Sequence, residues 1–290
     1  MNLLHCELCP NRCGANRTRA VGLCRAPEKA RICRMALHPW EEPIISGTRG
    51  SGTIFFAGCP LSCVFCQNVE ISQAPVGRAY SVNELIEGMQ RLVEEGAHNI
   101  NFVTPTHYAH VLKEALSRYR PPVPVVYNTG GYERIETLRA LEGLVDIYMP
   151  DLKYLSSELA LRYSGKADYP SVACAALDEM FRQVGDAVVK DGLLLHGMLV
   201  RHLVLPSHSA EGVRVMEYLT RRYGNRIYIS AMSQYTPHAR ASDFPEIDRR
   251  LKPIEYKRVV AALSRAGQTN CFVQDGESSD ECYIPPFALS

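Results

Sequence analysis

Three closely spaced cysteines constrain most strongly what this chain can fold into. They occupy the segment Gly58–Cys66 in the order Cys-x3-Cys-x2-Cys, as Cys59, Cys63 and Cys66. The segment follows directly on Thr53–Ala57, a short apolar run with the character of a buried strand. Spacings of three and two residues let one loop place its thiolates around a single compact centre. Three protein ligands suit a 4Fe–4S cluster in which one iron stays open to another molecule.

A second group of cysteines lies nearer the start of the chain. Cys6, Cys9, Cys13 and Cys24 form a Cys-x2-Cys-x3-Cys-x10-Cys set, in which Cys33 could replace Cys24. The total of 11 cysteines is odd, and the first 30 residues lack the apolar core of an export signal. We therefore expect a cytoplasmic metal-binding protein rather than a disulfide scaffold. Four thiolates would suit zinc or a second iron–sulfur cluster, and the spacing does not decide between them.

From about residue 52 the chain alternates apolar runs with helical periods. The clearest helix covers Ser81–Glu95, with Leu85, Met89 and Leu92 on one face and a capping-box spacing from Ser81 to Glu84. Strands are predicted over Thr53–Ala57, Asn99–Val103, Pro124–Tyr127, Val145–Met149, Met198–Val204, Arg226–Ala231 and Cys271–Gln274, and further helices near 108–119, 133–142, 156–164, 171–184, 211–223 and 255–266.

This repeated strand–helix order predicts an α/β fold with a parallel sheet and helices outside it. We expect an open sheet or incomplete barrel over residues 51–275, with its ligands at the carboxyl ends of the strands. Residues 1–50 are predicted to form a small Cys-rich lobe that buries little core and needs a metal to fold. Residues 276–290 are read as a C-terminal tail.

The cysteine triplet and the segments after the later strands resemble the radical S-adenosylmethionine (SAM) superfamily. Phe65 supplies the aromatic residue before the last cysteine. The order of Asn128–Tyr132, Met149–Lys153, Val200–Pro206 and Ser233–Pro237 is similar to that of pyruvate formate-lyase activating enzymes and their uncharacterised iron–sulfur homologues. The resemblance covers about residues 50–275. It implies a partial (β/α)6, TIM-like barrel of the radical SAM type, preceded by the small Cys-rich N-terminal lobe.

The resemblance also implies roles for particular residues. Cys59, Cys63 and Cys66 would ligate a 4Fe–4S cluster whose open iron chelates SAM. The usual Gly-Gly-Glu turn after the second strand is replaced by Thr104-Pro105-Thr106-His107, so the residue that meets the SAM amino group is open. Cofactor contacts are expected from Phe65, Thr104, Thr106, Asn128, Thr129, Asp151, Lys153 and Arg201, and substrate-facing candidates are His107, Gln234 and Tyr235.

The activity that the resemblance implies is reductive cleavage of SAM to a 5′-deoxyadenosyl radical, which abstracts hydrogen from a substrate. A protein or peptide, as for glycyl-radical activating enzymes, is the leading expectation. A small metabolite or nucleotide is the alternative, and a non-enzymatic iron–sulfur or zinc electron-transfer protein is a third. We expect an electron donor such as flavodoxin or ferredoxin, no membrane association, and no nucleic-acid partner despite the basic N-terminal segment.

Overall fold

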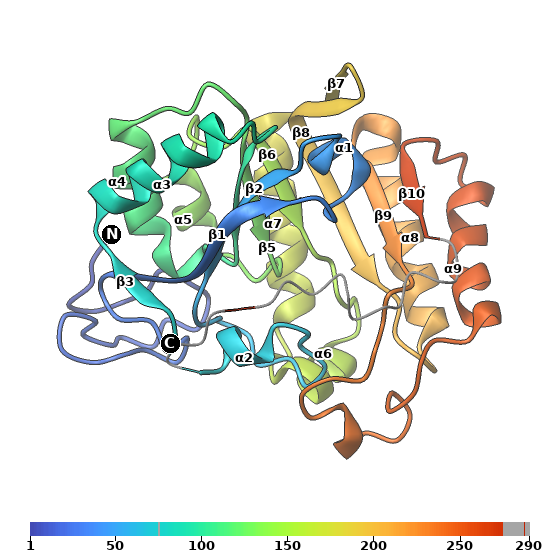
Figure 1. Ribbon diagram of the computed structural model, residues 1–290. Coiled ribbons are helices and arrows are strands. Elements are labelled where there is room, and N and C mark those ends of the chain that lie inside the picture. The colour runs from blue at the N-terminus through green and yellow to red at the C-terminus, as the bar shows by residue number, and fades with distance from the viewer. Residues whose placement is uncertain (75, 275–286, 288–290) are drawn as a thin grey trace.

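The computed structural model describes residues 1–74, 76–274 and 287, and its centre is one mixed sheet (Figure 1). The parallel core follows the order β2-β4-β5-β6-β8-β9, and β10 extends it in parallel at one edge. β1 and β3 continue it antiparallel at the other edge, and β7 pairs with β8. Within the described residues the edge strands β10 and β3 do not pair, so the barrel is open. The strands are β1 (Ala30–His38), β2 (Ser51–Phe56), β3 (Arg78–Tyr80), β4 (Ile100–Val103), β5 (Val125–Thr129), β6 (Ile147–Pro150), β7 (Val188–Lys190), β8 (Leu193–Leu203), β9 (Tyr228–Met232) and β10 (Cys271–Val273).

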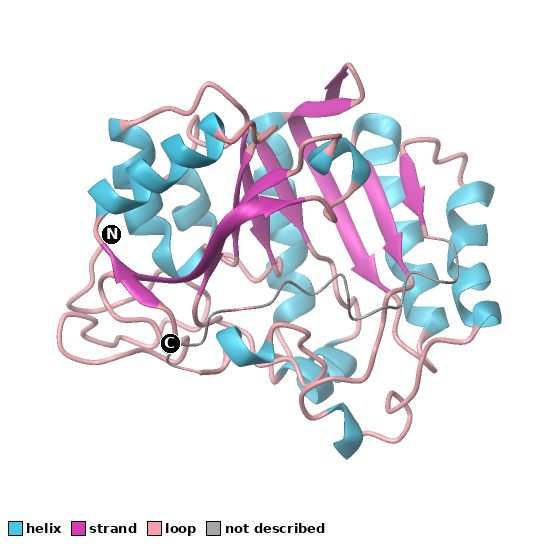
Figure 2. Cartoon of the chain, viewed as in Figure 1, coloured by secondary structure: helices cyan, strands magenta, loops and turns pink. Residues whose placement is uncertain are grey.

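Helices follow the parallel strands and cover the outside of the sheet (Figure 2). The helix predicted over Ser81–Glu95 is α3, and its Ser81 and Glu84 form the expected capping box. The helices are α1 (Pro43–Ser46), α2 (Val69–Ser72), α3 (Val82–Glu94), α4 (Ala109–Arg118), α5 (Ile135–Arg139), α6 (Ser157–Ser164), α7 (Tyr169–Val184), α8 (Ser209–Tyr223) and α9 (Pro253–Arg265). None of these helices is long and apolar enough to cross a membrane, a finding that covers the described residues.

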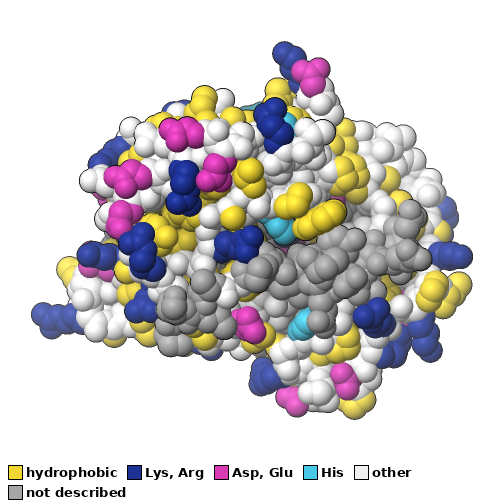
Figure 3. Space-filling view, in the orientation of Figure 1, with side chains coloured by type: hydrophobic (Ala, Val, Ile, Leu, Met, Phe, Trp, Pro, Cys, Tyr) yellow, Lys and Arg dark blue, Asp and Glu magenta, His cyan; other side chains and the backbone are white. Residues whose placement is uncertain are grey.

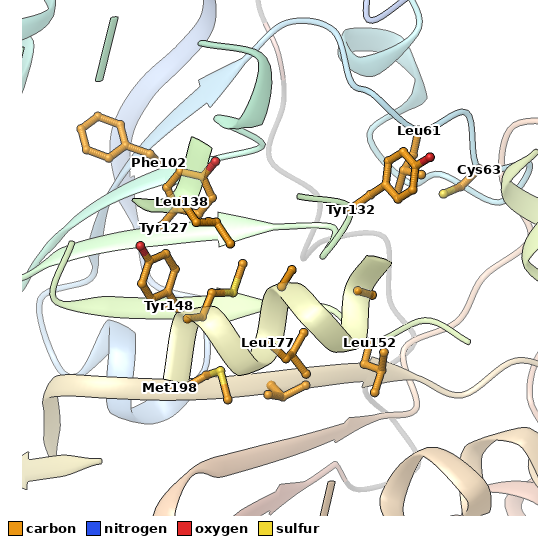
Figure 4. Close-up of a cluster of buried hydrophobic side chains, with 14 of the residues drawn as sticks. Leu61, Cys63, Phe102, Tyr127, Tyr132, Leu138, Tyr148, Leu152, Leu177 and Met198 are labelled. Carbon is orange, nitrogen blue, oxygen red and sulfur yellow. The ribbon is translucent and has the colours of Figure 1, made fainter. Parts of the chain in front are cut away.

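The outer face of the sheet builds the main core. Tyr127, Tyr148 and Met198, from β5, β6 and β8, are fully buried on this face with Leu177 of α7 (Figure 4), and the Tyr148 hydroxyl donates to Gln183 of α7 at 2.7 Å. Successive side chains of a strand point to opposite faces. The residues next to Tyr127, Tyr148 and Met198 in the chain therefore point to the inner face of the sheet.

The inner face is apolar in its first half and polar in its second. Val126, Met149 and Leu199 pack against Ile44 and Ile45 of the short helix α1, which therefore closes the inside of the barrel. Two residues further along each strand, the same inner face carries Asn128, Asp151 and Arg201. The change from apolar to polar side chains places a polar chamber at the carboxyl ends of the strands.

The predicted parallel strands and helices are all present, with ends that differ by a few residues, and the partial barrel is confirmed. The antiparallel strand β1 was not predicted. It lies inside the span read as the N-terminal lobe, residues 1–50, but it pairs with β2 along most of its length. Residues 1–29 contain no helix or strand. Except for Phe287, the predicted tail over 276–290 lies outside the described residues.

Candidate active site

A cavity of about 240 Å³ opens at the carboxyl ends of the strands. Its walls come from the loop after β2, from the ends of β4, β5, β6, β8 and β9, and from the segment between β1 and α1. Eleven of the residues predicted from the sequence line this one cavity: Cys59, Cys63, Cys66, Phe65, Thr104, Asn128, Thr129, Asp151, Lys153, Arg201 and Gln234. Side chains far apart in the chain therefore meet where a parallel sheet places its ligands.

The three cysteines form one wall. The Leu61 N–H donates to Cys59 Sγ at 3.4 Å, while Ser164 Oγ and Ser72 Oγ lie 3.1 Å and 3.3 Å from the sulfurs of Cys63 and Cys66. Burial, with the neighbouring Cys63 and Cys66 thiols, raises the pKa of the Cys59 thiol well above its ordinary value. One buried thiol, Cys63, and two half-buried ones, Cys59 and Cys66, line the same wall, and a positively charged group bound between them would stabilise their thiolate forms.

The geometry of the thiol loop fits a cluster. Among the described residues, no three cysteine, histidine, aspartate or glutamate side chains converge on one point as ligands of a single metal ion. A 4Fe–4S cluster makes a different demand, because each thiolate binds a different iron and the sulfurs surround the cluster. Cys59, Cys63 and Cys66 lining one cavity from one loop meet that demand.

The opposite wall is a buried ion network. Lys153 Nζ donates to Asp151 Oδ2 at 2.6 Å, and the Arg201 guanidinium donates to Asp151 Oδ1 at 3.1 Å and to Asn128 Oδ1 at 2.8 Å. The side chains of Lys153 and Asp151 are 18% and 17% exposed, so their pair is largely removed from water. A zwitterionic ligand with both an amino and a carboxylate group finds charges of both signs here.

Protonation in this network is set by its pairs. Burial works to raise the pKa of the Asp151 carboxyl, but Lys153 and Arg201 outweigh it and hold the pKa below the ordinary value. Burial likewise works to lower the pKa of Lys153, and Asp151 outweighs it and raises that pKa. Both groups are therefore charged at neutral pH.

A second acidic residue of the network, Glu41, was missed by the sequence analysis. Glu41 Oε2 accepts from Arg201 Nη1 at 3.3 Å, and its Oε1 accepts from Asn128 Nδ2 at 3.3 Å. His38, the last residue of β1, and Trp40, from the same segment as Glu41 between β1 and α1, also line the cavity. In Figure 3, hydrophobic side chains and a histidine lie together in the middle of the face that carries β1 and β2. Two adjacent carboxylates at Glu41 and Glu42, just before a helix, were the available signal.

Three predicted residues do not line the cavity. Thr106 directs its hydroxyl to Glu133, behind the cavity wall. His107 is buried and its Nε2 donates to the Ala57 carbonyl at 2.8 Å. Tyr235 is 1% exposed, its hydroxyl donates to the Ile247 carbonyl, and its ring packs at 6.0 Å from that of Phe65. These side chains support the wall from behind.

Glu133, also missed by the sequence analysis, is the buried anchor of that support. Its Oε1 accepts from the hydroxyls of both Thr106 and Thr129, and its Oε2 accepts from Tyr127 at 3.2 Å. Burial raises the pKa of the Glu133 carboxyl to about 7, although the three hydroxyl donors act against this. Glu133 therefore fixes the rotamer of Thr129, which lines the cavity.

A family model described as the radical SAM superfamily matches residues 53–200. "Uncharacterized protein MJ0674" of Methanocaldococcus jannaschii is 30% identical over 278 residues, which are 92% of this chain and 75% of that protein. "Uncharacterized protein MJ0808" of the same organism is 25% identical over 226 residues, which are 72% of this chain and 62% of that protein.

Among solved structures, Streptococcus suis SuiB superposes with a TM-score of 0.51 and 11% identity, over 76% of this chain and 47% of SuiB. SuiB bound to the precursor peptide SuiA gives a TM-score of 0.50 and 12% identity, over 75% of this chain and 46% of SuiB. This chain thus spans about half the length of SuiB, and the likeness is one of fold.

An open parallel barrel with three thiols facing a buried ion network is a cofactor-binding α/β barrel. The family model, which matches half of the chain, identifies it further: the chain belongs to the radical SAM superfamily. Members of this superfamily are enzymes, and the family implies a 4Fe–4S cluster and SAM.

Proposed function

We propose that this chain is a radical SAM enzyme that abstracts hydrogen from a protein or peptide, in the manner of glycyl-radical activating enzymes. One observation carries the proposal: three thiols and a buried ion network face each other across a single cavity. In the proposed reaction, the cluster and SAM when bound supply a 5′-deoxyadenosyl radical. The chain's own residues bind, orient and shield these groups.

The residues of the ion network divide the binding of SAM between them. Lys153 and Arg201 are the cations available to its carboxylate, and Asp151 and Glu41 are the carboxylates available to its amino group. The existing ion pairs keep each side chain in position before SAM arrives, so little ordering cost remains. Phe65, which lines the cavity beside Cys66, offers an aromatic face to the adenine.

The size of the cavity favours a substrate that stays largely outside it. Small-molecule sites usually measure about 300–1,000 Å³, and this cavity measures about 240 Å³. A substrate bound in addition to the cluster and SAM would therefore lie at the opening of the cavity. A segment of a protein or peptide that presents one C–H bond at the opening meets this constraint.

Trp40 supports the same substrate class. It lines the cavity and its side chain is still 60% exposed. A large aromatic side chain at the rim of a site is the residue type that contributes most at protein interfaces. We infer that Trp40 contacts the substrate outside the cavity.

The radical chemistry is tested by anaerobic reconstitution with iron and sulfide, followed by reduction with SAM present. Dithionite and a flavodoxin or ferredoxin serve as alternative reductants. We expect 5′-deoxyadenosine from the wild-type chain and none from Cys63→Ala, with Cys174→Ala, a thiol of α7, as the matched control. A wild-type chain that carries its cluster and forms no 5′-deoxyadenosine would refute the proposal.

The substrate class is tested with Trp40→Ala. We expect this variant to cleave SAM alone as fast as the wild type, but to lose most of its activity on a protein or peptide substrate. Val188→Ala, an exposed apolar residue in β7 away from the cavity, should change neither rate. If the chain acts on a small metabolite or nucleotide and Trp40→Ala keeps this activity, the hypothesis of a protein or peptide substrate is replaced by that of a small-molecule substrate.

A further inference from the structure

The four cysteines near the start of the chain lie together. Cys6, Cys9 and Cys24 are buried and Cys13 is half-buried. A Cβ added to Gly22 would lie 2.9 Å from Cys13 Sγ and 3.7 Å from Cys24 Sγ, so these two sulfurs flank one glycine. The Gly14 N–H donates to the Cys6 carbonyl at 3.0 Å and the Arg12 N–H donates to the Cys9 carbonyl at 3.1 Å, so tight turns hold the segment that carries Cys6, Cys9 and Cys13.

The structure also selects Cys24 over Cys33 as the fourth member. Cys33 lies in β1 and packs in a separate hydrophobic cluster with Phe55 and Ile71. A Cβ added to Gly77 would meet its sulfur at 2.9 Å. The set is therefore Cys6, Cys9, Cys13 and Cys24, here called the N-terminal thiol set.

A buried cation points into the N-terminal thiol set. Arg17 is 2% exposed, and its Nη1 lies 3.9 Å from Cys6 Sγ. Its other contacts are with the carbonyls of Ala26, Pro27 and His107 and with the ring of Tyr108. Within the described part of the chain, no carboxylate pairs with it. A buried cation without an anion is costly, and metal-bound thiolates at Cys6 would supply the missing negative charge.

The N-terminal thiol set touches the loop of the cavity cysteines directly. The Cys59 N–H donates to the Cys24 carbonyl at 3.2 Å, and Asn11 Nδ2 donates to the Pro60 carbonyl at 2.8 Å. Gly58 permits this approach, since a Cβ there would lie 2.3 Å from the Cys24 carbonyl oxygen. One backbone hydrogen bond thus joins a thiol residue of one set to a thiol residue of the other.

We propose that Cys6, Cys9, Cys13 and Cys24 bind a second 4Fe–4S cluster beside the catalytic one. The direct contact between the two thiol loops favours a redox-active group over zinc, because zinc has no redox chemistry. One electron enters the second cluster from an external low-potential protein donor of the ferredoxin or flavodoxin type. The same electron then leaves to the catalytic cluster, so the second cluster returns to its starting state and no bond in the protein changes.

The cluster is tested in the full chain with the catalytic site removed. We expect the Cys59→Ser, Cys63→Ser, Cys66→Ser variant to retain about four irons and four sulfides per chain. Adding Cys9→Ser and Cys24→Ser should remove this iron and sulfide. The Cys174→Ser, Cys271→Ser variant is the matched control and should keep about eight irons. This result does not depend on SAM turnover, so its failure is separate from failure of the proposed function.

Zinc without sulfide in the Cys59→Ser, Cys63→Ser, Cys66→Ser variant, or no metal at all, would overturn the proposal. If that variant does not fold, native mass spectrometry of the wild type decides between two clusters and one cluster with a zinc ion. The relay predicts that Cys9→Ser, Cys24→Ser keeps 5′-deoxyadenosine formation with dithionite and loses most of it with the protein donor. Equal losses with the two reductants would refute the relay.

Discussion

The two thiol sets of this chain are held in place by different means. Cys59, Cys63 and Cys66 sit on a loop anchored to β2, a strand buried along its whole length in the sheet. The N-terminal thiol set lies in residues 1–29, which form no helix or strand. That segment is held by Arg17 and by a few contacts with the barrel, such as Thr137 donating to the Leu8 carbonyl at 2.7 Å.

The difference shows where geometry is built before a metal arrives. A parallel sheet fixes the catalytic loop through its own hydrogen bonds and core, with or without a cluster. A short segment without regular structure gains most of its order from the group that it binds. The four predictions that follow test this contrast, from the largest expected effect to the smallest.

Removal of all metal by anaerobic chelation should have the largest effect, and only on one region. Residues 1–29 should become open to protease, while the barrel from β1 onward stays protected, because its core does not depend on metal. Mass spectrometry of early proteolytic fragments measures this, with reconstituted protein as the control. Equal protection of residues 1–29 and of the barrel in the metal-free chain would contradict the hypothesis that only residues 1–29 need metal to be ordered.

Arg17→Met should destabilise the metal-loaded protein by about 3–5 kcal/mol, because it removes a buried cation from beside the thiolates. It also leaves the carbonyls of Ala26, Pro27 and His107 without their donor. Denaturant unfolding and iron content measure the effect. Arg19→Met, at an exposed position of the same segment, should change stability by less than about 0.5 kcal/mol. Similar losses in both variants would argue against a special role for Arg17.

Gly58→Ala tests the contact between the two regions. Gly58 has φ of +84°, and a Cβ would come within 2.3 Å of the Cys24 carbonyl oxygen. The added methyl should therefore destabilise by about 2–4 kcal/mol, through backbone strain and forced separation. At Gly165, φ is +68° and a Cβ meets nothing within 4 Å. Gly165→Ala should lower the free energy of unfolding by about 1–2 kcal/mol, from backbone strain alone. An equal loss in Gly58→Ala and Gly165→Ala would show that Gly58 and the Cys24 carbonyl are not in tight contact.

Glu133→Gln tests the support behind the catalytic cavity, through pH. Burial raises the pKa of Glu133 to about 7, whereas it is near the ordinary 4.5 in the unfolded chain. Between these values the folded state binds more protons, so its stability falls as pH rises. Between about pH 5 and pH 8, we expect the free energy of unfolding of the wild type to fall by about 1–3 kcal/mol more than that of Glu133→Gln. Parallel pH profiles in denaturant unfolding would contradict the shifted pKa.

Much of the barrel and of the cavity follows from local patterns. Short apolar runs alternating with helical periods predict each parallel strand, and a motif at the end of a strand must lie at the carboxyl edge of the sheet. Cys59, Asn128, Asp151 and Lys153, all expected at strand ends, accordingly line one cavity. Thr106 and Tyr235 were expected to face the cofactor or the substrate, but their hydroxyls bond to Glu133 and to the Ile247 carbonyl instead. Sequence position alone does not determine the direction in which a side chain at a strand end points.

Local sequence patterns did not predict the roles of Glu41 and Glu133, for a different reason. Glu41 belongs to the segment read as the N-terminal lobe, and it enters the cavity because β1 folds back antiparallel onto β2. Glu133 resembles an ordinary polar residue before a helix until Thr106, Thr129 and Tyr127 are seen to surround it. Both roles depend on pairings between residues far apart in the chain.

The sequence by itself determined the order of strands and helices, the cysteine triplet at the end of the first parallel strand, and the existence of a second set of thiols. These depend on periodicity and spacing, which act over a few residues. The tertiary structure alone decided that Cys24 rather than Cys33 completes the second set, that Arg17 is buried beside it, and that Gly58 lets the two thiol sets touch. Those outcomes depend on which segments pack against each other and bury their side chains, and burial is a property of the whole fold.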